Sequence, residues 1–322
     1  YFTENLRNGE KIFIGLKPFN INYNNDLKIN FSGPVIKDKL YFFTNYRAQR
    51  INGHLNGIRR FEVWNLSNFY DQDSTKWISE NTGDSAFVPM ATGKYSSFMG
   101  KLSYNLGNIK LAFMVNQNNS ISQGYSHIYK YNPDGRGYGD AKTTLTMLQL
   151  NHFINNKMFY DLKFSRTHND YGSYLYEDYD SYEIISEDGI YRGDYFFAGD
   201  TLYNYVNDKY MTAYGTGFFT GGQDKGHLNR TLISDNLKFD FTIQANSAHS
   251  IKTGFSFINY DLSNASRTIR NAYSGTALEA DNYKPITLPD STVYSDIYNV
   301  YPKESSFYVQ DKYERDEMVI NF

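Results

Sequence analysis

The sequence predicts an all-β fold: an antiparallel transmembrane β-barrel segment of about ten strands, open and incomplete, with long loops on one side. Three observations carry this prediction. Apolar and polar residues alternate with period two in segment after segment. Each segment has about the 9–12 residues that a tilted strand needs to cross hydrocarbon. Short turns and long connections also alternate strictly along the chain, as in barrels with short periplasmic turns and long outer loops.

The clearest predicted strand covers residues 20–32. Apolar and polar residues alternate along it, so the strand has one apolar and one polar face. We expect the apolar face to point toward lipid on the convex side and the polar face to point toward the concave side. The apolar set is Ile21, Tyr23, Leu27, Ile29 and Phe31, joined from other strands by Leu102, Leu111, Leu162 and Phe239; the polar set includes Asn22, Lys28, Lys101, Lys163 and Lys238.

Nine further strands follow the same rule, and their connections alternate in length. Gly107-Asn108 is a typical two-residue hairpin signal. Loops longer than about 15 residues are uncommon in compact soluble domains, so four of them favour a barrel over a sandwich. The strands are predicted at about 40–50, 95–106, 143–152 and 305–314, around the alternating residues of 109–115, 158–165, 237–243 and 251–257, and from residue 318 onward; the long connections are predicted at 51–94, 118–142, 169–230 and 263–304.

Composition narrows the class of protein. The net charge of −3 provides no excess of positive charge for binding nucleic acid. Aromatic residues make up 18% of the chain, which suits strands and membrane-interface girdles. There is no cysteine, so disulfides and thiolate chemistry are excluded. No apolar run reaches the roughly 18 residues of a transmembrane helix. A mean hydropathy of −0.60 is acceptable for a barrel, because half of each strand and all of the loops are polar.

Residues 29–47, INFSGPVIKDKLYFFTNYR, carry a family resemblance. A strand that ends in Gly33-Pro34, then Lys-Asp-Lys and an aromatic strand, resembles TonB-dependent outer-membrane receptors. It is most similar to the Oar-like branch, whose plug follows a carboxypeptidase-regulatory-like domain. Weaker echoes are residues 249–254 and 307–312. In this motif Gly33 is expected to adopt a conformation barred to other residues, and Pro34 to end the strand pairing.

The resemblance implies that residues 1–322 form one partial β-barrel domain, about ten strands of about 22, without the plug and the C-terminal strands. It implies a receptor in the outer membrane of a Gram-negative bacterium. Its partners would be outer-membrane lipid, the TonB complex through the missing plug, and an unknown nutrient. A chain that starts at Tyr1 and ends within a strand is expected to be an internal fragment.

Catalytic and cofactor motifs are absent from the sequence, so we expect neither an enzyme nor a cofactor. The six histidines form no His-x-x-x-His pair, and there is no Gly-x-Ser-x-Gly elbow, Walker loop or dinucleotide fingerprint. Two alternatives to the receptor stay open: a soluble β-rich module that binds carbohydrate or peptide, and a porin without a plug.

Two loops are candidate ligand-binding segments. Residues 169–191 combine acidic side chains with tyrosines, which suits a ligand or Ca²⁺, or simply a solvated loop. Residues 124–142 combine tyrosines with cations, which suits sugars, peptides or anionic groups, or equally aromatic packing between loops. The candidate contacts are Tyr125, Tyr129, Tyr131, Arg136, Tyr174, Tyr176, Tyr179 and Asp180.

Overall fold

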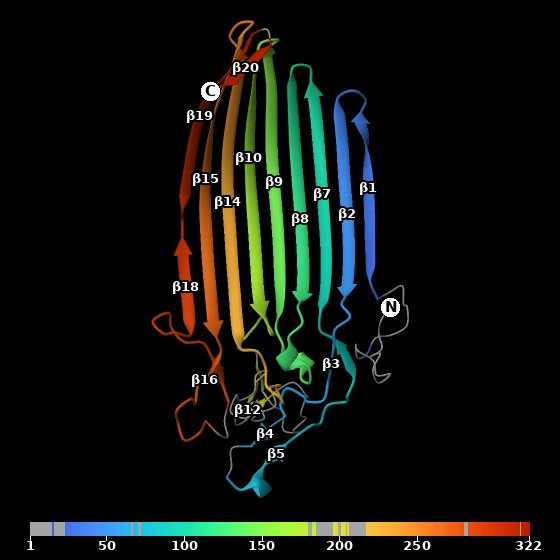
Figure 1. The fold of residues 1–322 in the computed structure, drawn as a ribbon, viewed down its shortest axis with the longest axis vertical. Helices are drawn as coiled ribbons and strands as arrows, with labels where there is room; N and C mark the ends of the chain where they lie inside the picture. Colours follow the sequence, from blue (N-terminus) through green and yellow to red (C-terminus); the bar gives the residue numbers. More distant parts are fainter. Residues whose placement is uncertain are drawn as a thin grey trace.

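A computed structural model shows one open, eleven-stranded antiparallel sheet (Figure 1). It describes residues 15, 23–65, 67–69, 72–179, 182–184, 196–198, 201–203, 205, 217–279, 283–315 and 317–322. Ten strands follow one another in chain order across the sheet, and an eleventh pairs beside them. The strands are β1 (Asn25–Ile36), β2 (Leu40–Asn52), β7 (Thr92–Leu106), β8 (Ile109–Gln123), β9 (Tyr138–Asn155), β10 (Met158–Tyr174), β14 (Gly226–Gln244), β15 (His249–Thr268), β18 (Ser295–Val300), β19 (Lys303–Arg315) and β20 (Met318–Asn321).

The structure confirms the predicted order of ten strands and adds β18. Both β18 and β19 pair with β15 in a single register, with Val300 opposite Leu262 and Lys303 opposite Asn259. The interruption between them contains Pro302, which has no N–H to give to the ladder, although its carbonyl accepts from the Tyr260 amide at 2.9 Å. β18 and β19 are therefore one long strand broken at a proline.

Most of the strands are longer than the sequence predicts, mainly toward the long connections. β9 begins at Tyr138 rather than near 143, and β10 continues to Tyr174 rather than ending near 168. Polar residues occupy both faces in these extensions, so alternation does not reveal them. At the start of the chain the strand begins at Asn25; Ile21 and Asn22 lie outside the described residues.

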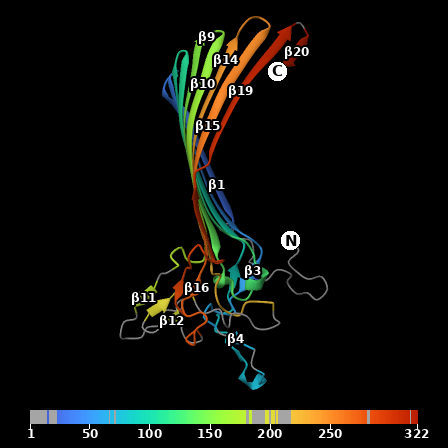
Figure 2. The same ribbon diagram turned by 90° about the vertical axis from the view of Figure 1, so that its left-hand side faces the viewer.

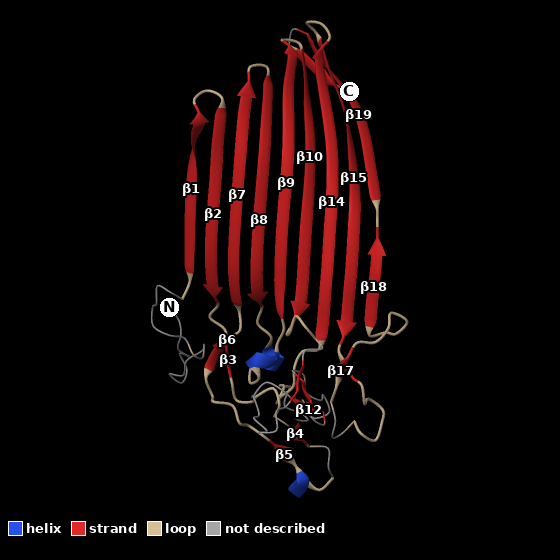
Figure 3. Ribbon diagram, turned by 180° about the vertical axis from the view of Figure 1, so that it is seen from behind, coloured by secondary structure: helices blue, strands red, loops and turns tan. Residues whose placement is uncertain are grey.

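All short turns lie at one end of the sheet and all long connections at the other (Figures 1 and 3). Gly107 takes a φ of 66° in the predicted two-residue turn. The prediction for Gly33 and Pro34 is wrong, because β1 continues through both to Ile36 with a bulge after Pro34. The left-handed residue of that turn is Asp38, at φ 59°.

The wall is a single curved and twisted layer (Figure 2). Its register places the predicted apolar residues on one face: Leu162 lies between Leu150 and Phe239, and Phe239 lies opposite Phe255. On the other face, Lys163 lies opposite Lys238. We call these the apolar face and the polar face.

The apolar band crosses the strands diagonally. On β2 and β7 the first charges beyond it, toward the loops, are the paired Arg50 and Lys94. Through the pairings of β8 and β9, the position of Lys94 corresponds to Gly172 on β10. The first charged residue beyond the apolar band on β10 is Arg166, which lies six residues closer to the short turns than Gly172. The boundary therefore lies six residues closer to the short turns on β10 than on β7, so it runs obliquely across these strands.

The long connections fold into a compact group at one end of the wall, which we call the crown: the described residues between β2 and β7, β8 and β9, β10 and β14, and β15 and β18. It contains short strand pairs, single turns of 3-10 helix and a buried cluster of Tyr205, Ile269 and Tyr283. Its elements are β3 (Asn56–Ile58), β4 (Ser67–Asn68), η1 (Ser74–Lys76), β5 (Ile78–Ser79), β6 (Phe87–Pro89), η2 (His127–Tyr129), η3 (Pro133–Gly135), β11 (Tyr182–Ile184), β12 (Phe196–Ala198), β13 (Thr201–Tyr203), β16 (Arg270–Asn271) and β17 (Pro285–Ile286).

Candidate ligand-binding loops

Three of the long connections are joined by one extended segment, residues 217–225. Three of its backbone amides donate to carbonyl oxygens of other loops: Phe219 to Ile128 at 2.8 Å, Gly222 to Val63 at 2.6 Å, and Asp224 to Gly135 at 2.7 Å. These bonds connect the β10–β14 connection to both the β2–β7 and the β8–β9 connections. The segment therefore fixes the three loops relative to one another.

This segment needs glycine where it crosses the β2–β7 loop. Gly221 has a φ of 149°, and a Cβ there would lie 2.1 Å from the carbonyl oxygen of Asn65. Its neighbour Gly222 accepts a 2.8 Å hydrogen bond from the buried side chain of Asn132. Backbone thus approaches backbone more closely than any side chain allows.

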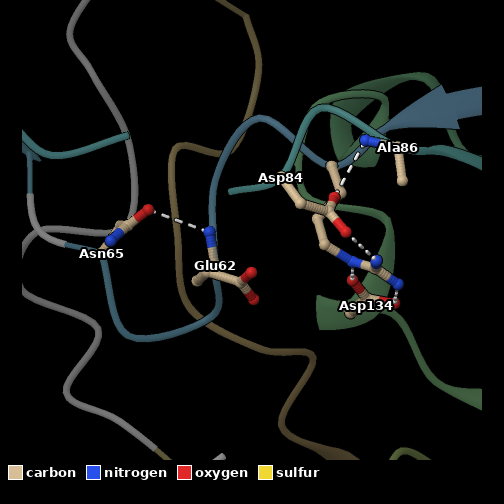
Figure 4. Close-up of polar contacts among 6 residues, drawn as sticks. Glu62, Asn65, Asp84, Ala86 and Asp134 are labelled. Carbon is tan, nitrogen blue, oxygen red and sulfur yellow. Dashed lines mark hydrogen bonds and ion pairs between the residues drawn. The ribbon is translucent and has the colours of Figure 1, made fainter. Parts of the chain in front are cut away.

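A second tie between loops is an arginine fork (Figure 4). Arg59 Nε lies 2.5 Å from Asp134 Oδ2 and its Nη1 lies 3.0 Å from Asp84 Oδ2. The Asp134 carboxylate, followed by that of Asp84, raises the pKa of Arg59 above its usual range. Nearby, the Asn65 side-chain oxygen accepts from the Glu62 amide at 2.9 Å. The Arg59–Asp134 contact joins the β2–β7 loop to the β8–β9 loop, whereas the Asn65–Glu62 contact stiffens the β2–β7 loop itself.

The predicted tyrosines of the β8–β9 connection pack against residues 218 and 219. Tyr129 is only 8% exposed and its ring lies 4.6 Å from that of Phe219. The Tyr131 ring meets Phe218 edge-on at 4.9 Å. Tyr125 contacts His127 through its hydroxyl, 2.8 Å from Nδ1. Aromatic packing between loops, one of the two readings that the sequence allows, describes Tyr129 well.

The tyrosines at the end of β10 and just after it lie around a buried histidine. Tyr174 stacks on His227 at 5.2 Å and Tyr179 meets the same ring edge-on at 5.6 Å. His227 is 3% exposed, and its Nε2 donates to the Glu177 carbonyl at 2.9 Å. Tyr176 packs edge-on against Tyr205 at 5.0 Å. Burial raises the pKa of Tyr205, so this ring stays neutral.

The candidate residues therefore fall into two aromatic groups in the crown. Tyr129 and Tyr174 are buried, and Tyr176 and Tyr179 pack on the buried cluster. Tyr125, Tyr131 and Arg136 stay partly exposed, and Asp180 lies outside the described residues. Their role in ligand contact stays a prediction. The sequence analysis missed the residues that tie the loops together: Arg59, Asn65, Asn132, Gly221, Gly222 and His227. The Gly221-Gly222 pair was the available signal for a close backbone approach.

Two hollows lie where the apolar face continues past the band toward the crown. One, of about 620 Å³, is lined by three carboxylates, Asp140, Asp170 and Glu177, together with two cations, Lys142 and Arg230. The other, of about 390 Å³, is lined by Arg50 and Lys94 and by no carboxylate. Across the ranges that the structure describes, no three His, Asp or Glu side chains are placed to hold one metal ion, and no helix is long and apolar enough to cross a membrane.

No family model matches the sequence, and no curated protein matches it. Among solved structures, the outer membrane transporter YddB from Escherichia coli superimposes with a TM-score of 0.54 at 8% identity, over 92% of this chain and 33% of that one. The ferric yersiniabactin uptake receptor FyuA from Yersinia pestis gives a TM-score of 0.43 at 9% identity, over 91% of this chain and 43% of that one.

The FyuA score is too low to carry an argument. This chain spans a third of the length of YddB, and at 8% identity the likeness concerns the fold alone. It agrees with the order, pairing and loop placement of the strands. The chain therefore has the fold of an antiparallel barrel wall such as that of an outer-membrane transporter.

Proposed function

We propose that this chain forms part of the barrel of a TonB-dependent outer-membrane receptor that takes up a large or scarce nutrient. One observation carries the proposal: a single-layered antiparallel wall keeps a continuous apolar face exposed. Leu148, Phe113 and Leu102 form a cross-strand row on that face and are 53%, 40% and 45% exposed. Such a surface is unfavourable in water and favourable in lipid, and a fold shared with an outer-membrane transporter supports lipid as its surroundings.

The polar face supports a water-filled or plug-filled lumen. Several of its charges are paired within the sheet: Arg47 donates to both oxygens of Asp26 at 2.8 Å, and the hydroxyl of Tyr308 donates to Asp240 at 2.5 Å. Lys163 lies 3.2 Å from Asp161. A face built this way suits contact with water or with a polar domain inside the barrel.

The crown supports ligand capture on the outer side. Its loops converge because every long connection leaves the same end of the wall (Figures 1 and 3). They are fixed to one another by the 217–225 segment and the Arg59 fork, and rigid scaffolds are where binding loops are effective. Energy-coupled movement of a plug and a link to the TonB complex come from the family resemblance and are part of the proposal.

The test is uptake by the full-length protein in outer membranes, with and without a functional TonB complex. A panel of labelled iron chelates, oligosaccharides and peptides is the probe. Accumulation that requires TonB supports the receptor. Accumulation that persists without TonB would favour the plugless porin, and a protein recovered in the aqueous fraction without detergent would favour the soluble binding module.

A further inference from the structure

Two cations face each other across neighbouring strands just beyond the apolar band. Arg50 on β2 lies directly opposite Lys94 on β7, and both side chains are exposed on the apolar face. Like charges directly opposite in a sheet destabilise the pair. In the part of the chain that the structure describes, neither residue forms an ion pair. The arrangement is unfavourable unless an anion lies between them.

A hollow of about 390 Å³ is present at this pair. Besides the two cations, its lining includes the polar side chains of Asn52, Gln123 and Tyr138, and no carboxylate. The neighbouring hollow of about 620 Å³ places Lys142 and Arg230 among three carboxylates. The two hollows therefore differ in charge: of the two, only the one at Arg50 and Lys94 has cations without carboxylates, and that one suits an anion.

The residues between the two cations and the apolar band indicate the source of the anion. Tyr46 lies opposite Phe98 at the edge of the apolar band, both exposed, and the next pair toward the cations is the small Ala48 and Ser96. The cations stand about 13 Å along the strand from the aromatic pair, less along the membrane normal because the strands tilt. Long basic side chains extend back toward such a boundary, and the small pair leaves room for them.

We propose that Arg50 and Lys94 hold a phosphate group of an outer-leaflet lipid headgroup. This inference rests on the proposed function, because it takes the apolar face to be the lipid-facing one. The occupant is a lipid rather than free phosphate because the site is continuous with the apolar band, so acyl chains on Tyr46 and Phe98 place the headgroup beside the cations. Arginine forks and lysine ammonium groups both bind phosphate oxygens well.

The test uses the full-length protein in phosphatidylcholine nanodiscs that carry lipid A or its dephosphorylated form. Lipid retained after detergent extraction is counted by native mass spectrometry. We expect the parent to retain phosphorylated lipid A, and the Arg50→Gln, Lys94→Gln double variant to retain roughly 10–30-fold less, since each cation near an anionic surface contributes a factor of about five. Lys142→Gln, in the carboxylate-lined hollow, should retain as much as the parent.

Equal retention by the parent and the double variant would overturn the proposal, as would equal retention of the dephosphorylated lipid. Displacement by millimolar inorganic phosphate alone would identify a free-phosphate site and overturn the lipid assignment. Incorporation into nanodiscs is scored first, by heat-modifiable mobility. A parent that does not incorporate contradicts the proposed function, whereas incorporation without phosphate-dependent retention contradicts only this inference.

Discussion

The wall and the crown solve opposite packing problems. In the wall, large apolar side chains such as Phe31 and Leu148 are 66% and 53% exposed. In the crown, Tyr205, Ile269 and Tyr283 are at most 1% exposed, and the buried apolar residues of the described chain all lie at this loop end of the molecule. The crown is built like a soluble protein, with its apolar residues inside, and the wall is built for a medium that is itself apolar.

The two regions also differ in what fixes their backbone. The wall is held by continuous ladders between neighbours in sequence, such as β14 with β15 over their whole length. The crown has only short strand pairs, so it depends on individual contacts: the Arg59 fork, the Asn132 side chain and the Gly221 crossing. A single substitution in the wall should therefore change stability mainly by altering contact with the lipid. A single substitution in the crown should change it by removing a contact within the protein.

The largest expected effect is on the apolar face of the wall. Leu162→Arg should weaken folding into lipid vesicles by about 2–4 kcal/mol, because the hydrocarbon offers no partner for the charge. The free energy of unfolding from vesicles measures this. Lys163→Leu, one residue along on the polar face, is the matched control and should fold nearly as well as the parent. The reverse ranking would mean that the faces are exchanged.

A somewhat smaller effect is expected at the crossing in the crown. Gly221→Ala places a Cβ 2.1 Å from Asn65 oxygen at a φ of 149°, so we expect a loss of about 2–3 kcal/mol confined to the crown. Gly107→Ala, in a short turn at φ 66° with open space around it, should cost only about 1 kcal/mol. Hydrogen exchange of the two regions distinguishes them; equal effects would contradict the close approach.

Removing the arginine fork tests the tie between two loops. Arg59→Ala should lower the protection of backbone amides against hydrogen exchange in residues 53–91 and 124–137 by about 1–2 kcal/mol. The substitution breaks charged hydrogen bonds that are only partly exposed to solvent. Arg60→Ala is the control, because the neighbouring side chain is exposed. Amide exchange in the wall strands should stay unchanged. Loss of protection there would show that crown and wall are not independent.

The smallest effect is a pH dependence of the same loop. The Ala86 amide, followed by Arg59, holds the pKa of Asp84 below its usual range. A carboxylate with a depressed folded pKa contributes stability above its unfolded pKa of about 3.9 and loses it as the pH falls through the folded value. Both tryptophans, Trp64 and Trp77, lie in this loop, so their fluorescence should change below about pH 4. In Asp84→Asn that component should disappear; an unchanged titration would contradict it.

Alternation in the sequence was enough to predict the wall, because each residue from Leu27 to Phe31 has only two possible faces and a sheet repeats that choice across strands. It could not reveal β18, which a proline separates from β19, nor the strand extensions, where both faces are polar. The crown was predictable only as loops. Its contacts join residues that are far apart in the sequence, such as Asn132 and Gly222. The presence of a tyrosine in the sequence also does not tell whether its ring is buried, as that of Tyr174 is, or exposed.

The most direct test of the account is which face of the wall meets lipid. Residues 1–322 contain no cysteine, and single cysteines are placed, in a full-length protein without other cysteines, at Leu102 and at Ser103, neighbours on opposite faces of β7. Each is labelled with a small fluorophore in the full-length protein reconstituted into vesicles. Brominated acyl chains should quench the label at position 102 strongly and the one at 103 weakly, while aqueous iodide should do the opposite. Equal quenching at the two positions, or the reverse order, would contradict the assignment of the apolar face to the membrane.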